Sequence, residues 1–276
     1  MTQKRSVLRK IGKFLAYAVA LVVVVLTSAH FAWKYSGSNQ WELWRDTNLT
    51  PAYNMKGRRL LPAQVYTKKV PGETRLQFKV VAQIRGNLDA IAAGMSDMTT
   101  EGCHNFLPTC TAGKIYKNFD EKDRTYIQDY RIVLPKWLPK EMAVVNRIHM
   151  WKDPQTKALL ITVKGVPELL PKDGCCILMT HLNNQWKFTP LENGMLEFEF
   201  TEDDDPGIPY YIYNPAFRRN KVGVPDTSQR VFNMEKYQHR KFEFLRDPVE
   251  KKVSDFAGQG GASPSVPSIH KPNVKG

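Results

Sequence analysis

Cysteine is scarce in this sequence, and the motifs of the common enzyme classes are missing. The chain of 276 residues has four cysteines, too few to hold a fold of this size together. It contains no Gly-x-Ser-x-Gly nucleophile elbow, no Walker phosphate loop and no His-Glu-x-x-His zinc helix. Its six histidines are scattered, without metal-ligand spacing. We therefore assign no catalytic residue, no metal and no cofactor. The question whether the protein is an enzyme stays open, and these absences favour a protein without enzymatic activity.

Acidic residues are also in deficit, and the surplus of positive charge is unevenly placed. The chain has 40 lysines and arginines against 27 acids, a net charge of +13. Five of the cations lie in residues 1–13, which contain no acid. The remainder is only mildly basic, so we predict no nucleic-acid partner. A hydrophobic content of 42% allows a packed core and excludes disorder of the whole chain.

Residues 14–33 form a run without Asp, Glu, Lys or Arg. A helix rises about 1.5 Å per residue, so twenty residues just cross a hydrocarbon layer of about 30 Å. The basic segment 1–13 is expected to stay in the cytoplasm. This predicts a single-pass protein of the inner (plasma) membrane whose folded part is periplasmic. A cleaved signal peptide is the alternative, with the small residues 27–29 near the cut.

The rest of the chain divides into three parts. Residues 34–58 are predicted to connect the span to a domain at 59–246, and could include a helix carrying Trp41, Leu43 and Trp44. Residues 247–276 are rich in Gly, Ser and Pro. Such a composition buries little apolar surface, so this segment is predicted to be a disordered tail.

Alternating apolar residues dominate the domain and predict an α+β fold rich in antiparallel strands. In residues 75–84, every second side chain is apolar, as in a half-buried strand. A helix is predicted from Asn87 to about Met98, and further helical segments near 208–212 and at 227–241. Strands are predicted at 64–70, 75–84, 111–118, 124–134, 142–151, 158–166, 175–188 and 194–201. A meander of this length must curl to bury its apolar face, and a C-terminal helix can fill the groove.

Three segments carry a resemblance to a known superfamily: Val65–Gly72 with the following strand, Trp186–Leu191 before Asn193-Gly194, and Asp205–Pro209. Over roughly residues 40–245, the sequence resembles the START-like (polyketide cyclase) superfamily, specifically its membrane-anchored bacterial lipid-binding type. Residues 101–108 depart from the family's Trp-rich segment. The resemblance implies a helix-grip fold that binds or transports a hydrophobic small molecule, most naturally a lipid. The alternatives are a cyclase- or aromatase-like enzyme and a protein-interaction module with a filled core.

The predicted ligand-binding residues come from the expected inner face of the sheet and from the closing helix. Asp129 and Arg131 share a strand face and would orient a ligand's head group if that face points inward. If it points outward, they form an ordinary surface ion pair. The full set is Phe78, Val80, Ile127, Asp129, Arg131, Val133, Leu196, Phe198, Tyr211 and Ile212.

The cysteines and one acidic run complete the candidates. In an exported domain, Cys103 and Cys110 are expected to form a disulfide. Cys103, His104 and Cys110 lack the fourth ligand of a zinc site. Cys175 and Cys176 are adjacent on a predicted strand, so they should point to opposite faces and serve as packing residues. The acidic run at 203–205 is interpreted as a solvated turn.

Overall fold

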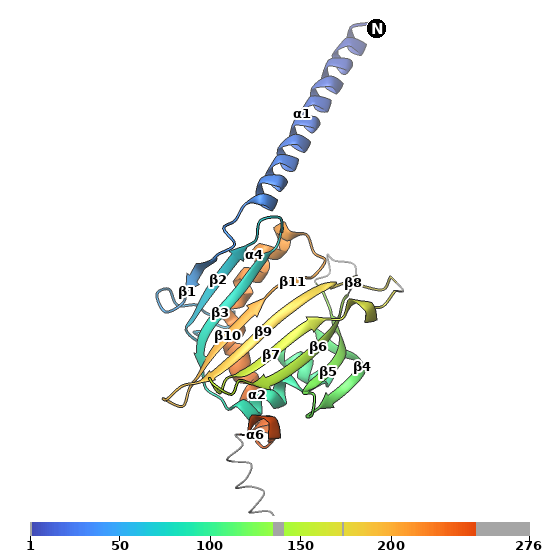
Figure 1. Ribbon diagram of the computed structural model, residues 1–276. Coiled ribbons are helices and arrows are strands. Elements are labelled where there is room, and N and C mark those ends of the chain that lie inside the picture. The colour runs from blue at the N-terminus through green and yellow to red at the C-terminus, as the bar shows by residue number, and fades with distance from the viewer. Residues whose placement is uncertain (1, 135–140, 173, 247–276) are drawn as a thin grey trace, which may run out of the picture.

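The computed structural model describes residues 2–134, 141–172 and 174–246 of the chain. A long N-terminal helix leads into one α+β domain, built from an 11-stranded sheet with helices packed on one side (Figure 1). The predicted tail at 247–276 lies outside the described residues.

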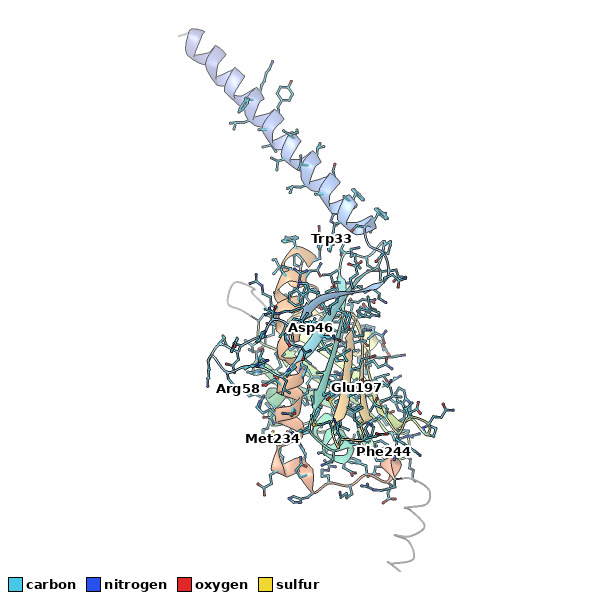
Figure 2. All side chains as sticks on the ribbon, turned by 90° about the vertical axis from the view of Figure 1, so that its left-hand side faces the viewer. Trp33, Asp46, Arg58, Glu197, Met234 and Phe244 are labelled. Atoms are coloured by element: carbon cyan, nitrogen blue, oxygen red, sulfur yellow. A yellow bond between two sulfur atoms is a disulfide. The ribbon has the colours of Figure 1, made fainter. Side chains whose placement is uncertain are left out.

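Helix α1 spans Thr2–Tyr35 and projects away from the domain (Figure 2). Its apolar part, Gly12–Tyr35, is 24 residues long and is not buried against the protein. At about 1.5 Å per residue it measures about 36 Å, enough to cross a bilayer. A retained membrane span and a signal sequence share these properties.

The sheet is open and almost entirely antiparallel. Its main strands follow the order β1-β2-β3-β10-β9-β7-β6-β5-β4. Their bounds are β1 Trp41–Asp46, β2 Ala63–Lys69, β3 Leu76–Ile84, β4 Cys110–Asp120, β5 Thr125–Ile132, β6 Met142–Lys152, β7 Leu159–Gly165, β9 His181–Pro190 and β10 Leu196–Glu202. Two short strands lie off this path. They are β8, Ile177–Leu178, which pairs with β6 in parallel, and β11, Asp204–Asp205, which pairs with β9.

Strand β1 replaces the helix considered for Trp41, Leu43 and Trp44. It pairs with β2, Trp41 lying opposite Lys68, and forms one edge of the sheet. Aromatic residues favour extended structure, and the free edge of β2 supplies backbone partners that an isolated helix would lack. The predicted strand at 175–188 is likewise divided, into β8 and β9.

The helices begin where local sequence signals place them. Asn87 caps α2, Leu88–Met95, by accepting a hydrogen bond from the Ala90 amide at 2.7 Å. Helix α3 covers Thr100–Phe106. The closing helical stretch is longer than predicted, because α4 (Tyr210–Asn220), the 3₁₀ turn Lys221–Gly223 and α5 (Val224–Phe232) follow one another without a break. Pro225 lies in the first turn of α5, where its missing N–H is not needed.

Three short helices complete the described part: the 3₁₀ turns Pro167–Leu169 and Glu243–Leu245, and α6, Glu235–Gln238. The main core lies between the sheet's concave face and helices α2 and α5. Phe232 of α5 packs edge-on against Phe106 and Phe188, at 5.6 Å between ring centroids in each case. Smaller clusters cover the other face of β6 and the start of β3.

Candidate ligand-binding cavity

A cavity of about 920 Å³ lies between the concave face of the sheet and helices α3, α4 and α5. Binding pockets for small molecules occupy roughly 300–1,000 Å³. Most of the side chains that line it are apolar. Those contributed by the sheet include Ile132, Met142, Val144, Ile148, Val163, Trp186 and Phe200.

Strand alternation builds the wall of this cavity. Trp186 of β9 and Phe200 of β10 lie directly opposite each other, and their ring centroids are 4.3 Å apart. Tyr126 and Tyr130 project from β5 on the same side. Burial raises the pKa of Tyr130 to about 12, so this phenol is neutral, and it is hydrogen-bonded to Tyr126.

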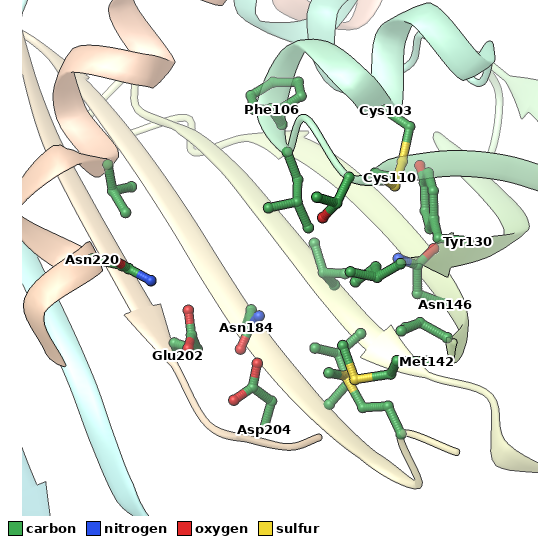
Figure 3. A pocket seen from close by; sticks show the side chains of 18 of the residues that line it. Cys103, Phe106, Cys110, Tyr130, Met142, Asn146, Asn184, Glu202, Asp204 and Asn220 are labelled. Atoms are coloured by element: carbon green, nitrogen blue, oxygen red, sulfur yellow. A yellow bond between two sulfur atoms is a disulfide. The ribbon is translucent and has the colours of Figure 1, made fainter. Parts of the chain in front are cut away.

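Four polar side chains form a buried cluster at one side of the cavity: Glu202, Asp204, Tyr213 and Lys221. The Lys221 ammonium forms an ion pair with Glu202. The Tyr213 hydroxyl lies 3.2 Å from Glu202 Oε1 and also bonds to Asp204 Oδ1. Figure 3 shows Glu202 and Asp204 gathered with Asn184 and Asn220, apart from Tyr130 and Asn146.

The number of protons available for the hydrogen bonds in this cluster indicates that Asp204 is protonated. A tyrosine hydroxyl has one proton, so it cannot donate to two carboxylates. The bonds are satisfied when protonated Asp204 donates to Tyr213 and Tyr213 donates to Glu202. Burial, and then the charge of Glu202, raise the pKa of Asp204 to about 7, although Lys221 acts in the opposite direction. Burial and the two carboxylates also raise the pKa of Tyr213, so its phenol keeps its proton.

A second polar group lies away from this cluster. Asn146 of β6 lines the cavity and is 6% exposed. Its Oδ1 atom has no hydrogen-bond partner among the residues that the structure describes. A buried acceptor without a partner costs free energy, which a ligand with a donor would recover.

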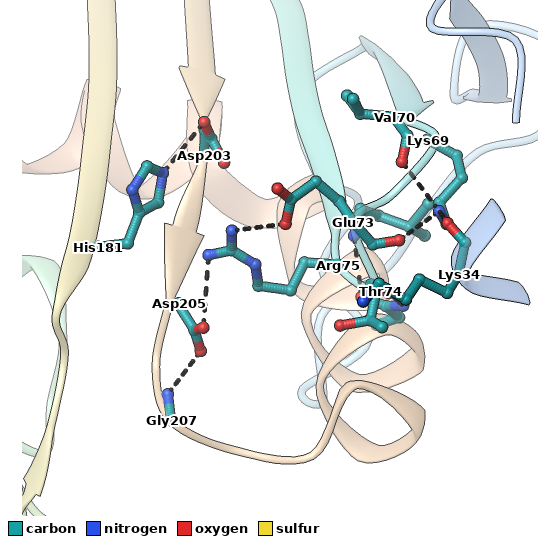
Figure 4. Close-up of polar contacts among 12 residues, drawn as sticks. Lys34, Lys69, Val70, Glu73, Thr74, Arg75, His181, Asp203, Asp205 and Gly207 are labelled. Carbon is teal, nitrogen blue, oxygen red and sulfur yellow. Dashed lines mark hydrogen bonds and ion pairs between the residues drawn. The ribbon is translucent and has the colours of Figure 1, made fainter. Parts of the chain in front are cut away.

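The end of α1 is attached beside the cluster. The Trp33 indole donates to the Thr74 carbonyl at 2.7 Å and stacks on Tyr210 of α4, with 6.1 Å between centroids. Trp33 also packs against a small apolar cluster made of Leu76, Phe78 and Tyr213, and Tyr213 is a member of the polar cluster. Lys69 donates to backbone carbonyls on both sides of this junction, including that of Lys34 at 3.1 Å (Figure 4).

Two disulfides form in the described part of the chain. Cys103 and Cys110 are joined, line the cavity and tie α3 to β4. Cys175 and Cys176 are also joined, so their interpretation as separate packing residues was wrong. Because β8 begins at Ile177, these cysteines lie in a bend, and the alternation of a strand does not apply.

The predicted ligand-binding residues are divided between the cavity and the core. Val133 and Ile212 line the cavity. Four others are buried in the packed core and do not line it: Phe78, Val80, Leu196 and Phe198. Tyr211 is 67% exposed and is not part of the cavity wall.

The face of β5 that carries Asp129 and Arg131 points away from the cavity, which corrects the inward placement of Ile127, Asp129 and Arg131. Ile127 packs with Val145 in the cluster on the other side of the sheet. Asp129 is buried there and forms an ion pair with Arg131 at 3.2 Å. Burial raises the pKa of Asp129, and Arg131 partly offsets the effect. The pair is thus neither a head-group site nor an ordinary surface pair.

The polar cluster was not predicted from the sequence, although the alternation of side chains in β10 indicates the inward position of its two acids. The inward alternation of Leu196, Phe198 and Phe200 continues through Glu202 to Asp204. Asp204 is 7% exposed, so the interpretation of the acidic run as a solvated turn was wrong for this residue. Lys221 and Asn146 had no comparable signal, because a single polar residue in a helix or strand is more often on the surface.

Solved structures share this fold at low sequence identity. A STAR-related lipid transfer protein fragment from Xanthomonas axonopodis is 16% identical with a TM-score of 0.55, over 70% of this chain and 99% of that one. The human StarD13 lipid transfer and protein localization domain is 13% identical with a TM-score of 0.54, over 78% and 97%. No family model and no curated protein matches the sequence. The chain therefore has the START-like helix-grip fold, as its sequence resemblance predicted.

Proposed function

We propose that this protein binds a hydrophobic small molecule, most naturally a lipid, in the cavity of its domain at 59–246. The cavity of about 920 Å³ carries the proposal, because it is large, mainly apolar and bounded by the sheet and by helices α3, α4 and α5. The structural neighbours named for lipid transfer add support from fold analogy. Transfer of the bound lipid between membranes belongs to the same proposal.

We further propose that residues 14–33 remain as an inner-membrane anchor and that the domain is periplasmic. The five cations in residues 1–13 favour an orientation with the N-terminus in the cytoplasm. The contacts of Trp33 would hold the cavity beside the bilayer. A reporter that is active only outside the cytoplasm should work when fused after residue 246. The full chain should also resist carbonate extraction. Recovery of a soluble form beginning near His30 would support a signal peptide instead.

Photolabelling tests the cavity directly. The full-length protein is placed in nanodiscs that contain a photoactivatable diacyl lipid, irradiated and digested, and the labelled peptides are mapped by mass spectrometry. We expect labels on β6, β9 and α4 peptides that line the cavity. Ile212→Trp should reduce them by filling ligand space, whereas the matched variant Tyr211→Trp should not, since Tyr211 is exposed. Labels confined to α1 would contradict the proposal.

A cyclase- or aromatase-like enzyme in the same cavity is the second candidate. The observation that favours it is Asp204, a buried acid whose pKa of about 7 suits proton transfer at neutral pH. Turnover of a polyketide that is lost in Asp204→Asn, with lipid labelling retained, would support this candidate. The interaction module required a filled core, which does not fit a cavity of this size.

A further inference from the structure

The charges that line the cavity are unequal in number, and this difference bears on the chemistry of the ligand. Three acids line it, Asp97, Glu202 and Asp204, whereas Lys221 is the single cationic lining residue in the described part of the chain. We propose, building on the function proposed above, that the cavity selects lipids whose polar group donates hydrogen bonds and carries no net negative charge. That polar group would lie against Asp204 and Glu202.

The ion pairs formed by these acids indicate which carboxyl group can accept a hydrogen bond from a ligand. Asp97 forms an ion pair with Lys236 at 3.1 Å, and Glu202 forms one with Lys221. Asp204 forms no ion pair among the described residues, and its Oδ1 atom contacts the Tyr213 hydroxyl. A ligand hydroxyl or ammonium group can donate to the carboxyl group of Asp204.

Lys221 is poorly placed to receive an anion. Its ammonium group is buried, is paired with Glu202 and lies 5.4 and 5.8 Å from the ring centroids of Phe78 and Phe200. A phosphate group bound there would lie close to the carboxylate of Glu202 and to Asp204. Repulsion between such groups is strong where little water screens them. The same surroundings favour a neutral donor or a cation.

Asn146 supplies independent support from another part of the cavity. Its side chain belongs to the cavity wall, and its Oδ1 atom is buried and lacks a partner in the described part of the protein. An acceptor of this kind is satisfied by a ligand O–H or N–H group. The cavity therefore offers acceptors at two separate places, and both call for donors on the ligand.

Two photoactivatable lipids with identical acyl chains test the proposal: diacylglycerol, which has a free hydroxyl group, and phosphatidic acid, which has a phosphate in its place. Each is supplied at the same mole fraction to the full-length protein in phosphatidylcholine nanodiscs. We expect at least tenfold more label from diacylglycerol on cavity peptides. Equal labelling, or a preference for phosphatidic acid, would overturn the head-group proposal while leaving lipid binding intact. Cavity peptides unlabelled by either lipid would overturn both proposals.

A pair of matched variants identifies the residue responsible. Asp204→Val removes both carboxyl oxygens at nearly constant shape and should reduce the preference at least threefold. Asp205→Val removes the neighbouring carboxyl group, which does not line the cavity, and should leave the preference unchanged. A preference unaltered by Asp204→Val would refute the role given to Asp204. If Asp204→Val fails to fold, the ratio measured in the unaltered protein still decides the head-group class.

Discussion

The buried carboxyl group of Asp204 should make the stability of the domain depend on pH in an unusual direction. Its pKa is about 7 in the folded protein, against 3.8 for an ordinary aspartate. The folded state therefore holds a proton that the unfolded chain releases between these two values. The stability gained from this proton is fully present below pH 3.8 and is lost as the pH rises to about 7. Burial is the main cause of the raised pKa and the charge of Glu202 adds to it, while Lys221, Tyr213 and Arg75 act in the opposite direction.

The Asp204→Asn variant removes the titration. Each pKa unit corresponds to about 1.4 kcal/mol. The change in the pKa from 3.8 to about 7 therefore allows the titration of Asp204 to change the free energy of unfolding by roughly 4 kcal/mol at most. An asparagine resembles the protonated acid and can donate to the Tyr213 hydroxyl through its amide. The free energy of unfolding of the variant minus that of the unaltered protein should therefore increase by at least about 1 kcal/mol from pH 5 to pH 8.

Urea unfolding of the full-length protein in nanodiscs, followed by tryptophan fluorescence at pH 5, 6.5 and 8, measures this gain. Glu197→Gln is the matched control, because Glu197 lies exposed on β10, the strand that precedes Asp204 in the chain. Its difference from the unaltered protein should not vary with pH. If the Asp204→Asn difference is equally constant, Asp204 is ionised throughout, and the proton assigned between it and Tyr213 is wrong.

Two further predictions concern the frame of the cavity. Replacing Cys103 and Cys110 together by serine should lower the free energy of unfolding by roughly 2–3 kcal/mol, as expected for a short disulfide loop, and urea unfolding measures this loss. Trp33→Ala should expose residues 36–40 to protease in nanodiscs while the urea midpoint of the domain stays nearly constant, because Trp33 joins α1 to the domain from outside the main core. Phe31→Ala, at an exposed position, should change neither property.

The fold was predictable because its signals are local. The alternation in β3 and β10 marks strands with one strongly buried side, and Asn87 marks the start of α2. Strand β1 was not predictable in this way, because its conformation depends on pairing with β2, which no local pattern records. The continuous helical stretch from Tyr210 to Phe232 (α4, a 3₁₀ turn and α5) was also missed, since Pro215 and Pro225 are residues that more often interrupt helices.

The sequence of β5 does not indicate which of its side chains face the cavity, and the reason is physical. Tyr126 and Tyr130 point to the cavity, while Ile127 packs with the cluster that contains Val166 and Leu170 on the other face, where Asp129 is also buried. When both faces of a strand are covered, both carry residues suited to burial, and alternation no longer distinguishes them. Strand β10 differs because Glu197 is exposed, and there the inner face was predicted correctly.

The position of the polar cluster suggests why buried charge is present in a domain that could have been more stable without it. Replacing a buried ion pair by apolar residues is often neutral or stabilising, so Glu202 and Lys221 are poorly explained by stability alone. Their neighbour Tyr213 belongs, with Leu76 and Phe78, to the small cluster against which Trp33 packs at the end of α1. The polar side of the cavity is thus the side next to the proposed membrane anchor. A lipid held there would keep its polar group toward the bilayer surface, so that it could enter and leave without turning over.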